Sequence, residues 1–212
     1  AQALHRHPPP PELNPAVLSA SGKFNIIKHG HDFLENLELD AAGPFQQKNL
    51  ATLVQAWDLL RHQINGLDES ALRTGLKNLK KLTRFIGRWE IKGENPTILC
   101  DSAHNEAGLR LAFEKIKTMP YKNLHVVTGF VNDKSVEKVL GLFPKEARYY
   151  FAKANIPRGL DAGILKEQAA GFGLEGRAYT SVPNAFKAAR HAAGTDDLIV
   201  VIGSIFVVAE IT

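Results

Sequence analysis

The chain has 212 residues, of which 44% are hydrophobic and 23% charged, and these are ordinary values for a globular protein. Its formal net charge of +4 comes from 26 Lys and Arg set against 22 Asp and Glu, an excess too small to indicate nucleic-acid binding. The single cysteine, Cys100, excludes an internal disulfide. No apolar run approaches a membrane span and no signal peptide is evident, so we expect a cytoplasmic protein without membrane contact.

The first part of the chain predicts a lead-in, a hairpin and helices. Residues 1–23 contain the prolines Pro8–Pro11 and are expected to be irregular. Short strands are predicted over residues 24–27 and 32–39. The helix that follows has apolar residues at intervals of three and four, namely Leu50, Leu53, Val54, Trp57 and Leu60. A second, more basic helix is predicted within residues 67–85.

From Gly87 onward, short apolar strands alternate with amphipathic helices. Strands are predicted over residues 97–100, 124–129, 148–152, 178–179 and 198–202. Helices are predicted over residues 106–117, 133–143, 161–170 and 183–193. Such alternation is typical of an α/β fold, so we predict a doubly wound, mostly parallel, Rossmann-like sheet.

Polar residues lie in the segments that follow the carboxyl ends of several of these strands. They are Asp101 and His104, then Lys134, then Arg158, and finally Ser204. The carboxyl ends of parallel strands meet at one edge of a sheet, where open α/β folds bind ligands. We therefore predict a binding site at this edge.

Several motifs occur in a characteristic order along the chain. They are Gly43-Pro44-Phe45-Gln46 with Asn49, Gly87-Arg88-Trp89-Glu90, Asp101-Ser102-Ala103-His104-Asn105, and Gly203-Ser204. Together they resemble the carboxyl-terminal half of folylpolyglutamate synthase/dihydrofolate synthase, in the Mur ligase superfamily. The family typically has Asp-Gly-Ala-His-Asn-Pro, and this chain differs by Ser102 and Glu106 at the Gly and Pro positions.

The resemblance implies an ATP-dependent amide ligase of folate metabolism. In that reaction ATP phosphorylates a carboxylate of dihydropteroate or of a folate's glutamate tail, and the amine of L-glutamate attacks the acyl phosphate. Family members carry a phosphate loop with Gly-Lys-Ser or Gly-Lys-Thr and the Mg²⁺ ligands in an amino-terminal ATPase domain. This chain has no such loop. We therefore expect it to require the ATPase domain of the same polypeptide as its partner, and to be inactive alone.

The same resemblance implies a division into domains. Residues 1–64 are expected to be the carboxyl-terminal remnant of the central ATPase domain, and residues 65–85 a connector. Residues 86–212 are expected to form the Mur ligase-type carboxyl-terminal domain.

The nucleotide-binding roles that the resemblance implies compete with ordinary structural explanations. Asn49 matches a residue that contacts adenine, but it also suits the first turn of a helix. Arg88 suits phosphate or ribose oxygens, or a surface pair with Glu90. Asp101 and His104 match residues that face the nucleotide. The alternative for Asp101 is a helix cap, and the alternative for His104 is a histidine with a structural role in the turn.

The catalytic and substrate-binding roles are expected at the same edge. Asp101 is expected to orient Arg88 or Lys134, or to contact a ribose or a metal-bound water. His104 can donate to a phosphate oxygen, and Lys134 can reach the same crevice. Arg158 is a candidate for binding the anionic tail of the substrate, and the alternative is a solvated loop residue. Ser204 matches a residue near the incoming glutamate, or is a helix cap.

Two other functions remain open at this point. One is a peptidoglycan Mur-type amino-acid ligase, and the other is a non-catalytic Rossmann-like binding module. The sequence also leaves open which acceptor is used, how many glutamates are added, and the oligomeric state.

Overall fold

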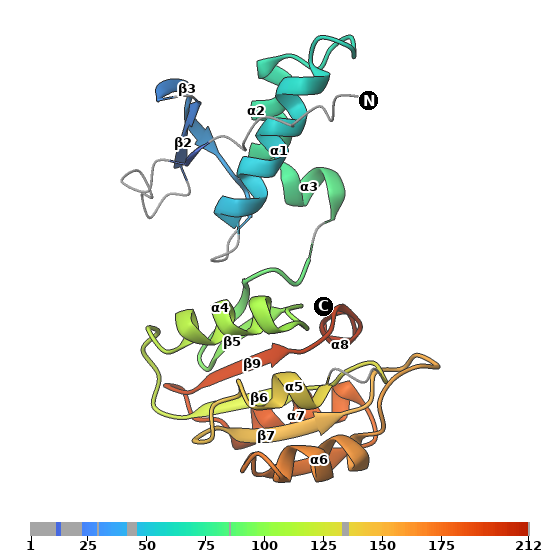
Figure 1. Cartoon of the computed structure of the whole chain (residues 1–212). Helices are drawn as coiled ribbons and strands as arrows, with labels where there is room; N and C mark the ends of the chain where they lie inside the picture. Colours follow the sequence, from blue (N-terminus) through green and yellow to red (C-terminus); the bar gives the residue numbers. More distant parts are fainter. Residues whose placement is uncertain are drawn as a thin grey trace. The chain divides into compact units, whose positions relative to one another are not determined.

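The computed structural model describes residues 12–13, 23–28, 30–41, 46–84, 86–132 and 136–211. The chain divides into two units, Ala1–Phe85 and Ile86–Thr212, and each is described by itself (Figure 1). Among the described helices, none has the length and apolar character needed to cross a membrane.

In the first unit a small antiparallel sheet packs against helices. Its elements are β1 (Glu12–Leu13), β2 (Lys23–Lys28), β3 (His31–Glu38), α1 (Gln46–Leu60), α2 (Glu69–Lys77) and α3 (Leu79–Thr83). The strands lie in the order β1-β2-β3. One face of α1 buries Leu50, Val54 and Trp57 in a core shared with Ile26 and Leu37 of the hairpin. The predicted spacing therefore produces the helix, but Leu53 and Leu60, which were predicted on the same apolar face, are exposed.

Two segments of this unit differ from the expectation drawn from the sequence. Within residues 1–23, which were expected to be irregular, β1 pairs antiparallel with β2. Residues 65–85, which were expected to be a connector, contain α2, whose Leu72 and Leu76 are buried in the core of the unit. Asp68 caps α2 by accepting the Ala71 N–H at 2.8 Å. This helix is thus a packed part of the first unit.

The second unit is built on a six-stranded sheet in the order β4-β5-β9-β6-β7-β8. Its strands are β4 (Glu90–Glu94), β5 (Thr97–Asp101), β6 (Leu124–Thr128), β7 (Arg148–Ala152), β8 (Gly176–Tyr179) and β9 (Leu198–Ile202). All neighbouring pairs are parallel except β4 with β5. The predicted doubly wound, mostly parallel sheet is confirmed. The antiparallel edge strand β4 was not predicted, because its sequence has no apolar run.

Helices cover both faces of this sheet (Figure 1). They are α4 (Glu106–Ile116), α5 (Val136–Leu140), α6 (Ala162–Ala170), α7 (Val182–Ala192) and α8 (Ile205–Ala209). Leu109, Leu140 and Leu165, from α4, α5 and α6, share one core, whereas α7 and α8 pack into a second. Every residue of the central strand β9 is buried as a result. Its continuous apolar sequence is what a strand covered on both faces requires.

Cys100 lies in β5 and is fully buried. Burial raises the pKa of its thiol to about 12, chiefly because the apolar surroundings disfavour the thiolate. Cys100 is therefore a core residue, as the sequence predicted, and is protected from thiol chemistry in the folded state.

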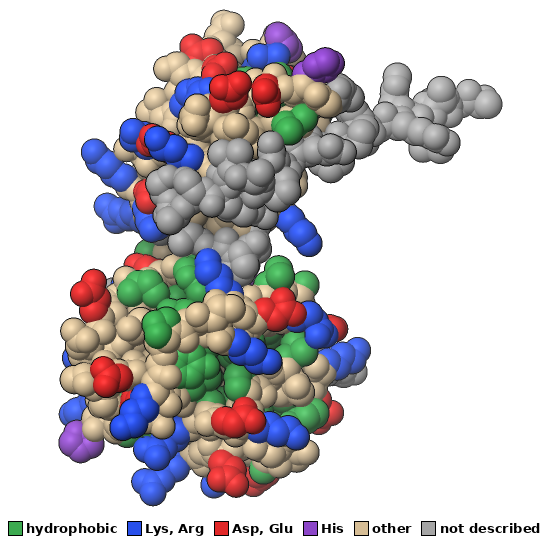
Figure 2. Space-filling model, turned by 90° about the vertical axis from the view of Figure 1, so that its left-hand side faces the viewer, with side chains coloured by type: hydrophobic (Ala, Val, Ile, Leu, Met, Phe, Trp, Pro, Cys, Tyr) green, Lys and Arg blue, Asp and Glu red, His purple; other side chains and the backbone are tan. Residues whose placement is uncertain are grey.

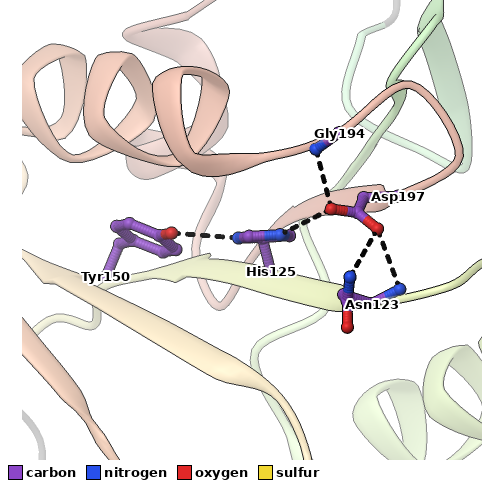
Figure 3. A network of polar contacts seen from close by, with 5 residues as sticks. All are labelled: Asn123, His125, Tyr150, Gly194 and Asp197. Carbon is purple, nitrogen blue, oxygen red and sulfur yellow. Dashed lines mark hydrogen bonds and ion pairs between the residues drawn. The ribbon is translucent and has the colours of Figure 1, made fainter.

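A buried polar network occupies the amino ends of the central strands (Figure 3). Asp197 accepts N–H groups from Gly194 at 2.8 Å, from the Asn123 backbone at 3.0 Å and from Asn123 Nδ2 at 2.9 Å. His125 Nε2 lies 3.2 Å from Asp197, and His125 Nδ1 lies 2.9 Å from the Tyr150 hydroxyl. A carboxylate only accepts, so we assign the Nε2 proton to this contact, and Nδ1 then accepts from Tyr150. The network ties β6 and β7 to the loop before β9.

On the face drawn in Figure 2, Lys and Arg side chains of the second unit are interspersed with Asp and Glu. No large single-sign surface is visible on that face. This distribution agrees with the small net charge of the chain.

Candidate functional site

A cavity of about 580 Å³ lies at the carboxyl edge of the second unit's sheet. Most of its wall is apolar, from Phe130, Val131, Val136, Val139, Ile205 and Phe206. Among its polar lining residues are His104, Arg158 and Ser204. These follow β5, β7 and β9, respectively, so strand ends far apart in the sequence converge on one cavity. This convergence agrees with the site predicted at this edge.

His104 lies between the end of β5 and the start of α4. Its Nδ1 lies 3.1 Å from the Ser102 carbonyl oxygen, and the side chain is exposed at the cavity. A carbonyl oxygen only accepts, so Nδ1 is the donor and Nε2 is left for a ligand. The next residue, Asn105, caps α4 by accepting the Gly108 N–H at 2.9 Å. The cap therefore belongs to Asn105, and His104 is available at the surface.

Arg158 lies in the loop after β7, which is fastened to the loop after β6. The Arg158 carbonyl accepts the Asn132 N–H at 2.7 Å, and Leu160 N–H donates to the Phe130 carbonyl at 2.9 Å. The guanidinium lies over the Phe206 ring, 5.6 Å from its centroid. A cation held over an aromatic ring at the wall of an apolar cavity suits a carboxylate or a phosphate.

Ser204 is a helix cap, which is one of the two alternatives that the sequence left open. Its Oγ accepts the Phe206 N–H at 3.2 Å and so caps α8, and it also lines the cavity. The hydroxyl proton is still available to a ligand, because a cap uses only the oxygen lone pair. Gly203 before it has a φ of +117°, and a Cβ there would lie 2.7 Å from Thr128 Oγ1. Glycine is therefore needed for the chain to enter α8 at this point.

Asp101 is fully buried at the end of β5, away from the cavity wall. Its Oδ2 accepts the Trp89 N–H at 2.9 Å, and its Oδ1 accepts the Ala103 N–H at 2.8 Å. Burial raises the pKa of this carboxyl, opposed by the two backbone hydrogen bonds and by the charge of Arg88. Of the roles expected for Asp101, this geometry favours orienting the segment that carries Arg88 over direct contact with a nucleotide or metal-bound water.

Three other expected site residues are not among the residues described as lining the cavity. Arg88 is half-buried on the turn before β4 and is not among the lining residues. Asn49 lies on α1 in the first unit, where its Nδ2 donates to Gln46 Oε1 at 3.2 Å. Lys134 lies outside the described residues.

The sequence analysis missed one cation of the cavity. Lys138 lines it from α5, whose other residues Val136 and Val139 form part of the apolar wall. A lysine on the polar side of a short amphipathic helix has no distinguishing pattern, so the sequence offered no signal for it. For metal binding, the described part of the chain contains no group of three or more His, Cys, Asp or Glu placed to hold an ion.

Comparisons with known proteins relate the chain to one family. A family model described as Mur ligase, glutamate ligase domain, matches residues 87–205. The chain is 32% identical over 178 residues to a Haloferax volcanii protein named "Probable bifunctional folylpolyglutamate synthase/dihydropteroate synthase", covering 82% of the chain and 20% of that protein. It is 31% identical over 184 residues to the Escherichia coli dihydrofolate synthase/folylpolyglutamate synthase, covering 85% and 40%.

A solved structure shows the same fold. The E. coli FolC in complex with DHPP and ADP superposes with a TM-score of 0.70 at 28% identity, covering 91% of this chain and 44% of that one. The chain thus spans less than half the length of these relatives. Because the family model matches more than half of it, the chain belongs to the Mur ligase family and corresponds to the carboxyl-terminal part of folylpolyglutamate synthase/dihydrofolate synthase.

Proposed function

We propose that this chain is the carboxyl-terminal part of an ATP-dependent ligase that joins L-glutamate to a folate, to dihydropteroate, or to both. The observation that carries the proposal is the cavity in which His104, Arg158 and Ser204 meet at the carboxyl edge of the sheet. Both relatives are named folylpolyglutamate synthases, and the Escherichia coli relative is also named a dihydrofolate synthase, which supports this substrate class. The remaining half of the ligase, with its phosphate loop, is the proposed partner within the same polypeptide.

The reaction places specific demands on the protein. The acceptor carboxylate becomes an acyl phosphate, the glutamate amine attacks its carbonyl carbon, and phosphate leaves as the amide bond forms. Positive groups and hydrogen-bond donors must stabilise the charge that develops, and water must be excluded because acyl phosphates hydrolyse. The cavity has an apolar wall and is lined by the cations Arg158 and Lys138, and its carboxylate Glu106 is paired with Arg110, so it suits both demands.

In this proposal Arg158 and Ser204 bind the glutamate substrate or an anionic tail. Arg158 is supported by its position over Phe206, which leaves the guanidinium beside the cavity. Ser204 has a proton free to donate to a carboxylate oxygen. Lys138 adds a second cation for the multiple carboxylates of a glutamylated substrate.

The nucleotide is assigned to Arg88, His104 and Asn49. Arg88 can donate to phosphate oxygens, and His104 Nε2 can do so in the imidazolium form, because in the neutral ring the proton is on Nδ1. The Asn49 amide can pair with an adenine edge. Asp101 acts indirectly, through the backbone that carries Arg88, and Lys134 is a further candidate for the phosphates. Magnesium, when bound with ATP, neutralises phosphate charge, and its protein ligands are assigned to the ATPase half.

The proposal also assigns a role to the first unit. Residues 1–64 are assigned to the central ATPase domain of the parent, and the cytoplasm is the proposed location. The isolated chain is then a binding part without catalytic activity, because it has no phosphate loop.

The test is ADP release by the intact parent with Mg-ATP and L-glutamate. Dihydropteroate, tetrahydrofolate and a muramyl peptide serve in turn as acceptor. Release that depends on either pteridine is expected, and the acceptor identifies the activity. Release only with the muramyl peptide would reassign the chain to peptidoglycan synthesis. Turnover by the isolated 212-residue chain would contradict the role given to the missing half.

The substrate role of Arg158 has its own test in the same assay. Arg158→Ala is expected to raise the KM for glutamate about tenfold to a hundredfold, because a charge-assisted hydrogen bond is lost. The matched control is Arg177→Ala, since Arg177 is also exposed but lines a different cavity. An unchanged KM for glutamate in Arg158→Ala would remove Arg158 from the substrate site.

A further inference from the structure

The turn that carries Arg88 has an uncommon backbone. Gly87 has a φ of +68° and Trp89 a φ of +49°, so the residues on both sides of Arg88 are in the left-handed region. A tryptophan adopts this conformation only at an energetic cost, and such residues cluster where a side chain must be placed accurately. The surrounding structure must therefore hold the turn in place.

Three hydrogen bonds fix this turn. Gly87 N–H donates to Glu90 Oε2 at 3.0 Å, and Trp89 N–H donates to Asp101 Oδ2 at 2.9 Å. The Gly87 carbonyl accepts the Ser102 N–H at 2.7 Å. The two bonds from Asp101 and Ser102 come from the end of β5, whereas the Glu90 carboxylate closes the turn from within.

Packing holds the same segment from two sides. A Cβ on Gly87 would lie 2.7 Å from Val208 Cγ1, so the turn rests directly on α8. The buried Trp89 ring has the Lys115 ammonium 4.7 Å from its centroid. The direction in which the Arg88 side chain leaves the turn is thereby set by the backbone.

We infer that Glu90 is a positioning residue for Arg88: its carboxylate closes the turn from which the arginine extends toward the nucleotide. The inference rests on the proposed function, in which Arg88 binds phosphate. Glu90 does not need to touch the nucleotide itself. Its other oxygen, Oε1, lies 3.5 Å from Lys92 Nζ, and the side chain is only 25% exposed. Both oxygens are thus directed to this chain's own groups.

The test compares Glu90→Ala with Glu90→Gln in the intact parent. Glutamine retains an oxygen that can accept the Gly87 N–H, whereas alanine removes it. We expect Glu90→Ala to raise the KM for Mg-ATP about tenfold with little change in the KM for glutamate, and Glu90→Gln to restore most of the loss. Glu94→Ala, at the exposed far end of β4, is the matched control and is expected to behave as wild type.

A double-mutant cycle then asks whether Glu90 acts through Arg88. If it does, Glu90→Ala adds no further loss of kcat/KM for Mg-ATP in an Arg88→Ala background. Equal additional losses in both backgrounds would overturn the inference. So would a parallel rise of the KM for Mg-ATP and for glutamate, together with a lowered unfolding midpoint, since that pattern indicates a purely structural role.

The same experiment separates the inference from the function on which it rests. An Arg88→Ala variant with an unchanged KM for Mg-ATP contradicts the nucleotide role of Arg88. If Arg88→Ala is impaired and Glu90→Ala is not, only the positioning role fails.

Discussion

Asp101 and Asp197 are both buried carboxylates at ends of the same sheet, yet their pKa values shift in opposite directions. Burial raises the pKa of both. At Asp101 two backbone N–H groups and Arg88 do not compensate for burial, and the pKa stays above its ordinary value. At Asp197 hydrogen bonds from Gly194, Asn123 and His125 outweigh burial and hold the pKa below its ordinary value. Asp197 accepts more hydrogen bonds than Asp101, and its pKa is lowered because these bonds outweigh the effect of burial there.

The lowered pKa of Asp197 predicts a pH dependence of stability. An unfolded Asp titrates near pH 4, so the unfolded state takes up the proton first as the pH falls. The contribution of Asp197 is therefore present above about pH 4 and is lost as the pH falls through the lower, folded pKa. Asp197→Asn is expected to be less stable than wild type at pH 7, with the difference shrinking on acidification, in urea unfolding between pH 7 and pH 3.

Asp196→Asn is the matched control, because Asp196 is the exposed neighbour. Its unfolding free energy is expected to follow wild type at every pH. If Asp197→Asn and wild type lose stability in parallel, the network in Figure 3 does not contribute in the way described.

At the scale of elements, the entry into α8 depends on Gly203. A side chain there meets Thr128 Oγ1 at 2.7 Å and the Gly129 carbonyl at 2.8 Å, and the φ of +117° disfavours any L residue. Gly203→Ala is expected to lower the free energy of unfolding by about 1–3 kcal/mol, which is the usual cost of overpacking. Gly194→Ala, whose Cβ would have its nearest neighbour at 3.6 Å, is the control in the same denaturation assay. Equal stability of the two variants would show that the strand end can relax.

The elements that the sequence predicted best are the buried parallel strands. β7 and β9 begin and end where expected, because a strand covered on both faces is a continuous apolar run bounded by polar residues. The edge strand β4 escaped prediction because three of its five residues are charged. The short helix α8 escaped too, since its sequence Ile-Phe-Val-Val-Ala has no amphipathic period.

The same reasoning separates the site residues that could be predicted from those that could not. His104, Arg158 and Ser204 lie in the segments that follow β5, β7 and β9, and parallel strand ends converge, so their meeting at one cavity was predictable. The inferred positioning role of Glu90 could not be predicted, because Glu90 accepts a backbone N–H in a turn whose shape is known only from the structure.

At the scale of the whole molecule, each unit has its own core. We therefore expect residues 86–212, expressed alone, to unfold in one cooperative transition, followed by circular dichroism during heating. The sheet and its helices form two buried clusters without any residue of the first unit. A gradual, non-cooperative loss of signal would contradict this expectation and would show that residues 1–85 are needed for folding.

The burial of Cys100 has a practical consequence for measuring the separation of the two units. The native chain presents no reactive thiol, so a cysteine introduced on the surface accepts a spin label or a fluorophore selectively, and no native residue has to be removed. Exposed positions such as Lys81 in the first unit and Glu167 in the second suit such labels. Distance distributions between the two labels, recorded with and without nucleotide, would then measure whether the separation of the units depends on the nucleotide.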